Sequence, residues 1–143
     1  MIALLDVNTL VALAWPNHSH HGAAHEWFAG WKSGWATTPL TEIGFVRISS
    51  NSIVLASPVR PVDAIEHLSR LRAMSDHSFW PDSIEGVVGD DLDPTRVLGH
   101  RQVADAHLIA LAIANNGTVA TFDKGFASLI GKNHARHITL ISA

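Results

Sequence analysis

The chain has 143 residues, of which 47% are hydrophobic and none is cysteine. This length suits a single domain spanning residues 1–143, and the composition excludes a disordered chain, a disulfide scaffold, a thiolate zinc site and a cysteine nucleophile. Ten Lys and Arg against 13 Asp and Glu give a net charge of −3, which by itself does not favour a nucleic-acid-binding protein.

The elements expected along the chain alternate between strands and helices. Strands are expected at Met1–Leu5, Trp35–Thr37, His77–Pro81, Thr118–Phe122 and Ile138–Ile141. Helices are expected at Asn8–Trp15, 20–31, 39–48, Pro61–Met74, Ile84–Val88, Val103–Asn115 and Lys124–Ile130, and a further helical turn is expected to start at Asp93-Pro94. Regular alternation predicts an α/β protein, a three-layer α/β/α fold with a mostly parallel central sheet.

The longest uncharged apolar stretch, residues 106–122, is interrupted by Asn115, Asn116 and Gly117. We therefore expect no membrane span. The segment before Asp6 is too short for the apolar region of a signal peptide, and nothing basic precedes it. Together with the absence of cysteine, this favours a cytoplasmic protein.

Four acidic residues stand at the ends of buried strands or on helices that are otherwise apolar. They are Asp6, Glu42, Asp105 and Asp123. Stripping water from a carboxylate is costly, and no run of Lys or Arg lies nearby to compensate. Because parallel strands end at one edge of a sheet, where such folds place their ligands, we expect one crevice to collect all four.

Clustered carboxylates repel each other by about 4 kcal/mol per close pair at an effective dielectric of ~20, unless some are protonated or a cation lies between them. Oxygen ligands without cysteine favour Mg²⁺ or Mn²⁺ over zinc or copper. One or two such ions suit hydrolysis of a phosphodiester. If bound cations neutralise four of the 13 acids, the nine that remain face ten bases, and charge then excludes no phosphate-bearing substrate.

Each acid also has an ordinary structural interpretation. Asp6 and Asp123 fit turn or helix-cap residues, and Glu42 fits the start of its helix. Asp105 fits an ion pair with Arg101, four residues earlier on the same helical face. A hypothesis in which all four ordinary explanations hold at once is weaker than one shared metal site.

Four segments, LLDVNTLVAL, TPLTEIGFVRI, VADAHLIALA and TVATFDKGF, resemble the signature segments of PIN domains, and more narrowly of VapC-type toxin ribonucleases. The resemblance spans nearly the whole chain in order. It implies a divalent-metal-dependent endoribonuclease with Mg²⁺ or Mn²⁺ on the four acids, Asp6 and Asp105 being the foremost ligands. It further implies that Asn8 and Thr121 orient the carboxylates. Structured tRNA or rRNA as substrate, a cognate antitoxin as partner and a homodimer complete the expectation.

Three cations adjoin these acids in sequence: Arg47, Arg101 and Lys124. They are candidates for contacts with RNA phosphates, although Arg101 is favoured as a structural ion pair. The clustered histidines, with His21 and His25 four residues apart, lack the glutamate of a zinc motif and are interpreted as a solvated helix start. His107, two residues beyond Asp105, is interpreted as a packing residue.

The five tryptophans are predicted to serve the core or a protein interface rather than to stack on bases. The acidic run at residues 89–93 is interpreted as a solvated turn.

Two other functions remain open at this point. LLDVNT after the first strand resembles the motif of aspartyl-phosphate phosphotransferases, but Asn8 stands where their second, proton-donating aspartate is expected. A binding module that keeps the fold without turnover is the other alternative, and the presence of all four acids disfavours it.

Overall fold

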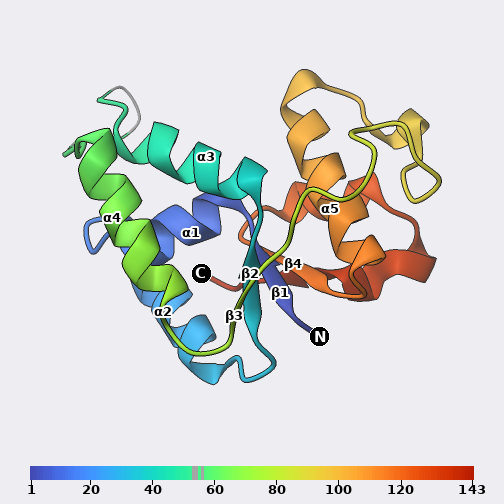
Figure 1. Ribbon diagram of the computed structural model, residues 1–143. Coiled ribbons are helices and arrows are strands. Elements are labelled where there is room, and N and C mark those ends of the chain that lie inside the picture. Colours follow the sequence, from blue (N-terminus) through green and yellow to red (C-terminus); the bar gives the residue numbers. More distant parts are fainter. Residues whose placement is uncertain (53–54, 56) are drawn as a thin grey trace.

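The computed structural model describes residues 1–52, 55 and 57–143, and over them it confirms the predicted α/β architecture. The sheet has five strands, all parallel, in the order β3-β2-β1-β4-β5. The strands are β1 Ala3–Leu5, β2 Trp35–Thr37, β3 His77–Phe79, β4 Thr118–Thr121 and β5 Ile138–Leu140. The chain termini lie at the surface (Figure 1).

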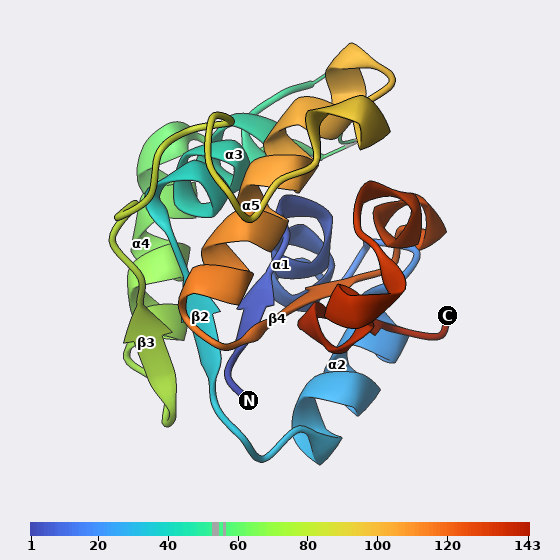
Figure 2. The same ribbon diagram turned by 90° about the vertical axis from the view of Figure 1, so that its right-hand side faces the viewer.

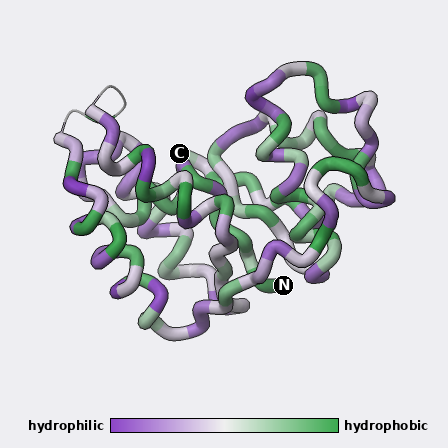
Figure 3. Tube along the Cα trace, turned by 45° about the horizontal axis from the view of Figure 1, so that its top comes forward, coloured by the Kyte–Doolittle hydropathy of each residue, from purple (hydrophilic) through white to green (hydrophobic). Residues whose placement is uncertain are grey.

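Helices cover both faces of this sheet. The α-helices are α1 Val7–Ala14, α2 His21–Gly30, α3 Pro39–Ser49, α4 Pro61–Arg72 and α5 Val103–Ala114. Four 3₁₀ segments follow in the second half of the described chain: η1 Pro94–Arg96, η2 His100–Gln102, η3 Lys124–Leu129 and η4 Lys132–His137. Figure 2 shows α5 in front of the strands, with α1 and α4 behind them. Along α4 the trace alternates between hydrophobic and hydrophilic residues, as a half-buried helix requires (Figure 3).

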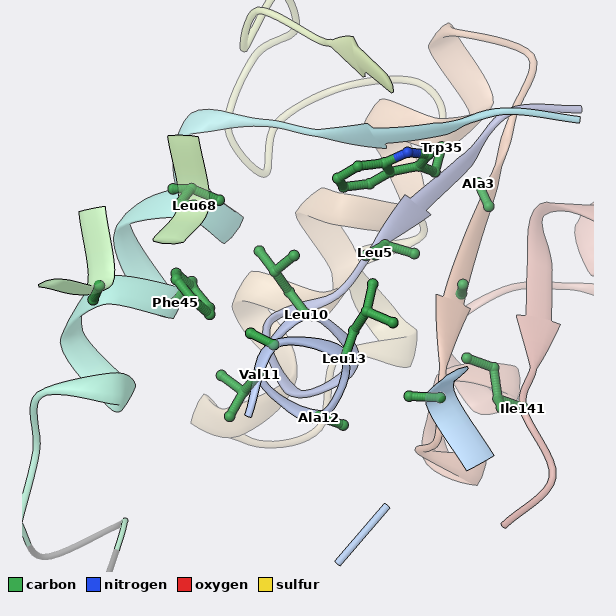
Figure 4. Packing of buried hydrophobic residues seen from close by; sticks show 14 residues of the cluster. Ala3, Leu5, Leu10, Val11, Ala12, Leu13, Trp35, Phe45, Leu68 and Ile141 are labelled. Carbon is green, nitrogen blue, oxygen red and sulfur yellow. The ribbon is translucent and has the colours of Figure 1, made fainter. Parts of the chain in front are cut away.

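Alternation along the strands divides the interior into two cores. Ala3 and Leu5 of β1 face the cluster that holds α1, Phe45 of α3 and Leu68 of α4. Leu4 points to the opposite face and joins α5 and η3. Figure 4 shows the first cluster, where the side chains of α1 radiate toward all its neighbours. The helix α1 is thus surrounded by protein, which fixes the position of whatever its N-terminus carries.

The tryptophans belong to these cores, as the sequence predicts. Trp35 and Trp80 are buried, and the other three are half-buried and pack against the first cluster. Trp15 stacks on Phe45, and its indole N–H donates to the Ser49 hydroxyl at 2.8 Å.

The predicted helix at Ile84–Val88 is wrong. The segment from Pro81 to Asp93 is irregular, and His107 on α5 holds it. The buried His107 ring contacts an Asp82 carboxylate oxygen through Nε2 at 2.7 Å, and its Nδ1 contacts the Gly86 carbonyl. His107 lies 21 and 25 residues further along the chain, so these contacts are a tertiary effect that the local sequence does not display.

Two smaller expectations also change. Residues 124–129 form a 3₁₀ helix rather than an α-helix. The histidines near α2 do more than begin a helix: His21 and His25 donate to the carbonyls of Ala12 and Leu13 at the end of α1. These carbonyls have no partner within α1, so the histidines cap it. No helix in the described residues is long and apolar enough to cross a bilayer.

Candidate active site

The carboxyl ends of the strands converge where the sequence analysis places them, beside the N-terminal end of α5. There the structure has an open pocket of about 780 Å³. Its walls come from the start of α1, one face of α3 with the residues that follow it, and the first turn of α5. Asp6, Asn8, Arg47 and Asp105 all line it.

Asp6 is the buried member of the site, with 5% of its surface exposed. It is the N-cap of α1: Oδ1 accepts the Thr9 amide hydrogen at 2.8 Å. Oδ2 accepts the Thr121 hydroxyl at 2.6 Å. Burial raises the pKa of Asp6, the hydrogen bonds from Thr121 and Thr9 oppose that rise, and the charge of Asp123 adds to it. The protein therefore holds this carboxyl group in one orientation, and no Lys or Arg in the described residues pairs with it.

The Thr121 hydroxyl connects two of the acids. Its oxygen accepts the amide hydrogen of Asp123 at 3.0 Å, so its own proton is directed at Asp6. This geometry agrees with the orienting role that the resemblance implies for Thr121. Asn8, for which the resemblance implies the same role, is exposed at the pocket, and its side chain makes no hydrogen bond within the described residues.

Asp105 lies half-buried in the first turn of α5. Its pKa is raised to about 6, first by burial and then by the negative charges of Asp6 and Asp123. The alternative ion pair with Arg101 is absent, and in the described part of the chain no Lys or Arg pairs with Asp105. The negative charge of Asp105 is therefore uncompensated by any nearby protein cation.

Asp123 is exposed and outside the pocket lining, yet its charge raises the pKa of both other aspartates. Its Oδ1 accepts the Gly125 amide hydrogen at 2.7 Å and so begins η3. The structure thus brings together three of the four predicted acids, from the ends of β1 and β4 and the start of α5.

Glu42 does not line this pocket, so in this structure the crevice expected for all four acids does not include its side chain, and a role of Glu42 as a metal ligand stays a prediction. One carboxylate oxygen is 3.3 Å from the Arg72 guanidinium, and the other accepts the Thr37 hydroxyl at 2.6 Å. Thr37 in turn contacts His77 Nε2 at 2.8 Å. Glu42 is absent from the pocket lining because it lies on another face of α3 than the lining residues.

Of the three candidate cations, one lines the pocket and two do not. Arg47 lines the pocket, on the wall formed by α3. Arg101 in η2 and Lys124 at the start of η3 are exposed and lie outside the lining. The pocket also has a polar rim that was not predicted from the sequence; it follows α3 and consists of Ser50, Asn51 and Ser52. The only available signal was a polar run at the end of a helix, which also marks ordinary loops.

The donor set fits a hard divalent cation. It consists of carboxylate oxygens, one firmly oriented and one half-buried, whose pKa values are raised first by burial and then by the neighbouring negative charges. Within residues 1–52, 55 and 57–143, no three acidic or histidine side chains already surround a common point at which an ion would be held. Binding would therefore draw the three aspartates closer together.

Removing the Thr121 hydroxyl is expected to weaken the site without removing a carboxylate. In Thr121→Val, Asp6 loses a hydrogen-bond donor, and we expect metal affinity and activity to fall by about 10- to 100-fold. Thr118→Val is the matched control, because it removes another buried hydroxyl from β4 whose only hydrogen-bond partner among the described residues is Thr139. Equal losses in the two variants, measured by Mn²⁺ titration and circular dichroism melts, would mean that Thr121 acts through stability alone.

Comparison with known proteins places these residues in a family context. A model of the PIN domain matches residues 3–132. Ribonuclease VapC39 of Mycobacterium tuberculosis (strain CDC 1551 / Oshkosh) is 51% identical over 128 residues, covering 89% of this chain and 92% of the relative. Ribonuclease VapC38 of M. tuberculosis (strain H37Rv) is 45% identical over 142 residues, covering 99% of both. The crystal structure of M. tuberculosis VapC20, a sarcin-ricin-loop-cleaving toxin, superposes with a TM-score of 0.60 at 13% identity, over 88% of this chain and 93% of that one.

Proposed function

The chain belongs to the PIN-domain family, and within it to the VapC ribonucleases, and from that membership we propose that Asp6, Asp105 and Asp123 hold the divalent ion with which it hydrolyses RNA. The activity is that of an endoribonuclease, the toxin of a toxin–antitoxin pair. The observation that supports the metal assignment is that Asp6 and Asp105 line one pocket without a paired Lys or Arg in the described residues, while burial and then the charges of Asp6 and Asp123 raise the pKa of Asp105 to about 6.

The ion, Mg²⁺ or Mn²⁺, supplies a lowered pKa for a water molecule and neutralises negative charge on the phosphate. Asp6 provides a fixed oxygen, because Thr9 and Thr121 hold its carboxylate in one orientation. Asp105, whose pKa is raised to about 6, would accept a hydrogen bond from the attacking water through its carboxylate oxygen and take up the single proton that this water releases, while Asp123 would help to hold the ion. The water oxygen adds to phosphorus as the bond to the leaving ribose oxygen breaks, and that oxygen leaves as a hydroxyl group after taking a proton from solvent.

The substrate we propose is structured RNA of the tRNA or rRNA class, with Arg101 and Lys124 as outer phosphate contacts on either side of the acids. The partner is a cognate antitoxin whose binding covers the pocket, and the active species is a homodimer acting in the cytoplasm. The openness of the pocket supports this proposal, because its volume of about 780 Å³ accommodates more than a single nucleotide.

The surroundings of Asp6 disfavour the phosphotransferase alternative. Both oxygens of Asp6 are engaged by hydrogen bonds and 95% of its surface is buried, an environment that hinders attack on a phosphoryl group. Asn8 offers no acid to protonate a leaving group. The similarity to proteins named as ribonucleases also favours RNA hydrolysis.

Metal removal tests the proposal directly. The purified chain, freed of its antitoxin, should cleave a mixture of tRNA and rRNA in Mg²⁺ or Mn²⁺, and EDTA should reduce the rate to the level of buffer alone. Addition of excess Mn²⁺ should restore it. Cleavage that persists in EDTA would contradict the metal assignment, whereas a phosphoryl group trapped on Asp6 from a phosphate-ester substrate would favour the phosphotransferase.

A further inference from the structure

One face of α3 forms a wall of the pocket. Its lining residues are Leu40, Ile43, Gly44, Arg47 and Ile48. Their spacing of three, four, seven and eight residues identifies a single helical face. The face approaches α1 closely at Gly44, where a Cβ atom would lie 2.6 Å from the Val7 side chain. This contact sets how α3 is turned toward the site.

Glu42 lies off this face, and both of its oxygens are engaged. Its side chain is 16% exposed, with one oxygen on Arg72 and the other on Thr37. Arg72 is itself held over the Phe79 ring, 4.8 Å from the centroid. Turning the carboxylate into the pocket would break both contacts and leave the Arg72 guanidinium without its anion. The network therefore favours Glu42 as a bridge between α3, α4 and β2.

The charge that α3 does bring to the pocket is positive. Arg47 is the one Lys or Arg among the lining residues in the described part of the chain. It is exposed, and within the described residues its guanidinium makes no ion pair or hydrogen bond. The same pocket contains Asp6 and Asp105. It therefore has carboxylates on one side and a guanidinium that is not committed to any carboxylate on another.

We propose that α3 supplies a cation in place of an acid: the site holds one divalent ion on the three aspartates, and the Arg47 guanidinium binds the RNA phosphate from the opposite wall. This inference rests on the proposed ribonuclease function. A guanidinium matches two phosphate oxygens at once and is always charged, so it stabilises the charge that grows on those oxygens during hydrolysis. In this arrangement Glu42 is a positioning residue for α3.

A calorimetric titration with Mn²⁺ tests the one-ion site separately from the role of Arg47. Wild type and Glu42→Gln should both bind one Mn²⁺ per chain, with affinities within about threefold, while Glu42→Gln melts earlier because the bridge to Arg72 is weakened. Two ions in wild type and one in Glu42→Gln would overturn the one-ion site. So would a loss of Mn²⁺ binding of tenfold or more in Glu42→Gln.

Arg47→Ala should bind Mn²⁺ at least as tightly as wild type and yet lower kcat/KM for RNA by roughly 10²- to 10³-fold. Its binding to RNA in EDTA should weaken, with a salt dependence reduced by about one phosphate contact. Arg47→Lys should restore part of this loss, since it keeps the charge but not the paired geometry. Arg70→Ala on α4, an exposed arginine outside the pocket, is the matched control.

Cleavage by Arg47→Ala at the wild-type rate would overturn the role of the guanidinium. If wild type itself cleaves no RNA, the proposed function fails on its own. The Mn²⁺ titration and the RNA-binding comparison in EDTA then still decide between a one-ion site with a phosphate-binding arginine and a site completed by Glu42.

Discussion

Replacing Asp6 with asparagine is expected to lower kcat/KM for RNA by roughly 10³-fold or more while leaving the protein folded. Asparagine is as good an N-cap as aspartate, so its side-chain oxygen can still accept the Thr9 amide hydrogen. What disappears is the buried negative charge that the ion requires. Because burial raises the pKa of Asp6, removing that charge should not lower the melting temperature in EDTA.

The matched control for Asp6→Asn is Asp63→Asn. Asp63 also loses one negative charge, but it lies on α4 in an exposed pair with Arg60. Cleavage assays and melting curves on both variants separate an effect of the site from an effect of net charge. Activity of Asp6→Asn within tenfold of wild type would contradict the assignment of Asp6 to the ion.

The second large effect concerns Asp105, whose replacement should stabilise the protein in EDTA and destabilise it relative to wild type in Mn²⁺. The pKa of Asp105 is about 6 in the folded chain, above the ordinary 3.8. The folded state therefore binds more protons than the unfolded state between about pH 4 and 6, and stability falls as pH rises through that window.

A rise of the pKa from 3.8 to about 6 corresponds to roughly 3 kcal/mol, and solvent screening of this half-exposed group reduces it to about 1–2 kcal/mol. Asp105→Asn should gain that amount in urea melts at pH 7.5 in EDTA and almost nothing at pH 4. In saturating Mn²⁺ the order should reverse, because only wild type keeps tight binding and the stabilisation that comes with it. We expect Mn²⁺ affinity to fall by at least ~100-fold.

Asp63→Asn again serves as the control. The hydrogen bond from Arg60 lowers the pKa of the Asp63 carboxyl group, so the Asp63→Asn protein should be slightly less stable than wild type at neutral pH. If Asp105→Asn is less stable than wild type in EDTA at pH 7.5, the carboxylate is structural, and the electrostatic account of the site fails.

Elements that depend on local pattern were predictable from the sequence. Ala3–Leu5 and Thr118–Thr121 are buried apolar strands, and α5 is apolar over most of its surface, so their type follows from composition and length. The ends of these strands locate Asp6 and Asp123. The irregular course of residues 81–93 was not predictable, because His107 determines it from across the sequence.

The separation of Glu42 from the three aspartates was also not predictable from the sequence. Helical spacing groups Ile43, Gly44 and Arg47 on one face and separates Glu42 from them, but it does not say which face turns toward the site. That choice depends on the close approach of Gly44 to Val7 and on the reach of Arg72 from another helix. Tertiary contacts decided it, and the resemblance alone pointed to the other side chain.

The position of Trp15 makes its fluorescence useful for monitoring ligand binding at this site. Its indole is bonded to Ser49 at the very end of α3, next to the polar rim of the pocket, and it stacks on Phe45 of the same helix. Displacement of that wall by a bound nucleotide or inhibitor should alter the emission of this fluorophore. Subtracting the spectrum of Trp15→Phe from that of wild type would isolate its signal and give an unlabelled optical readout of occupancy.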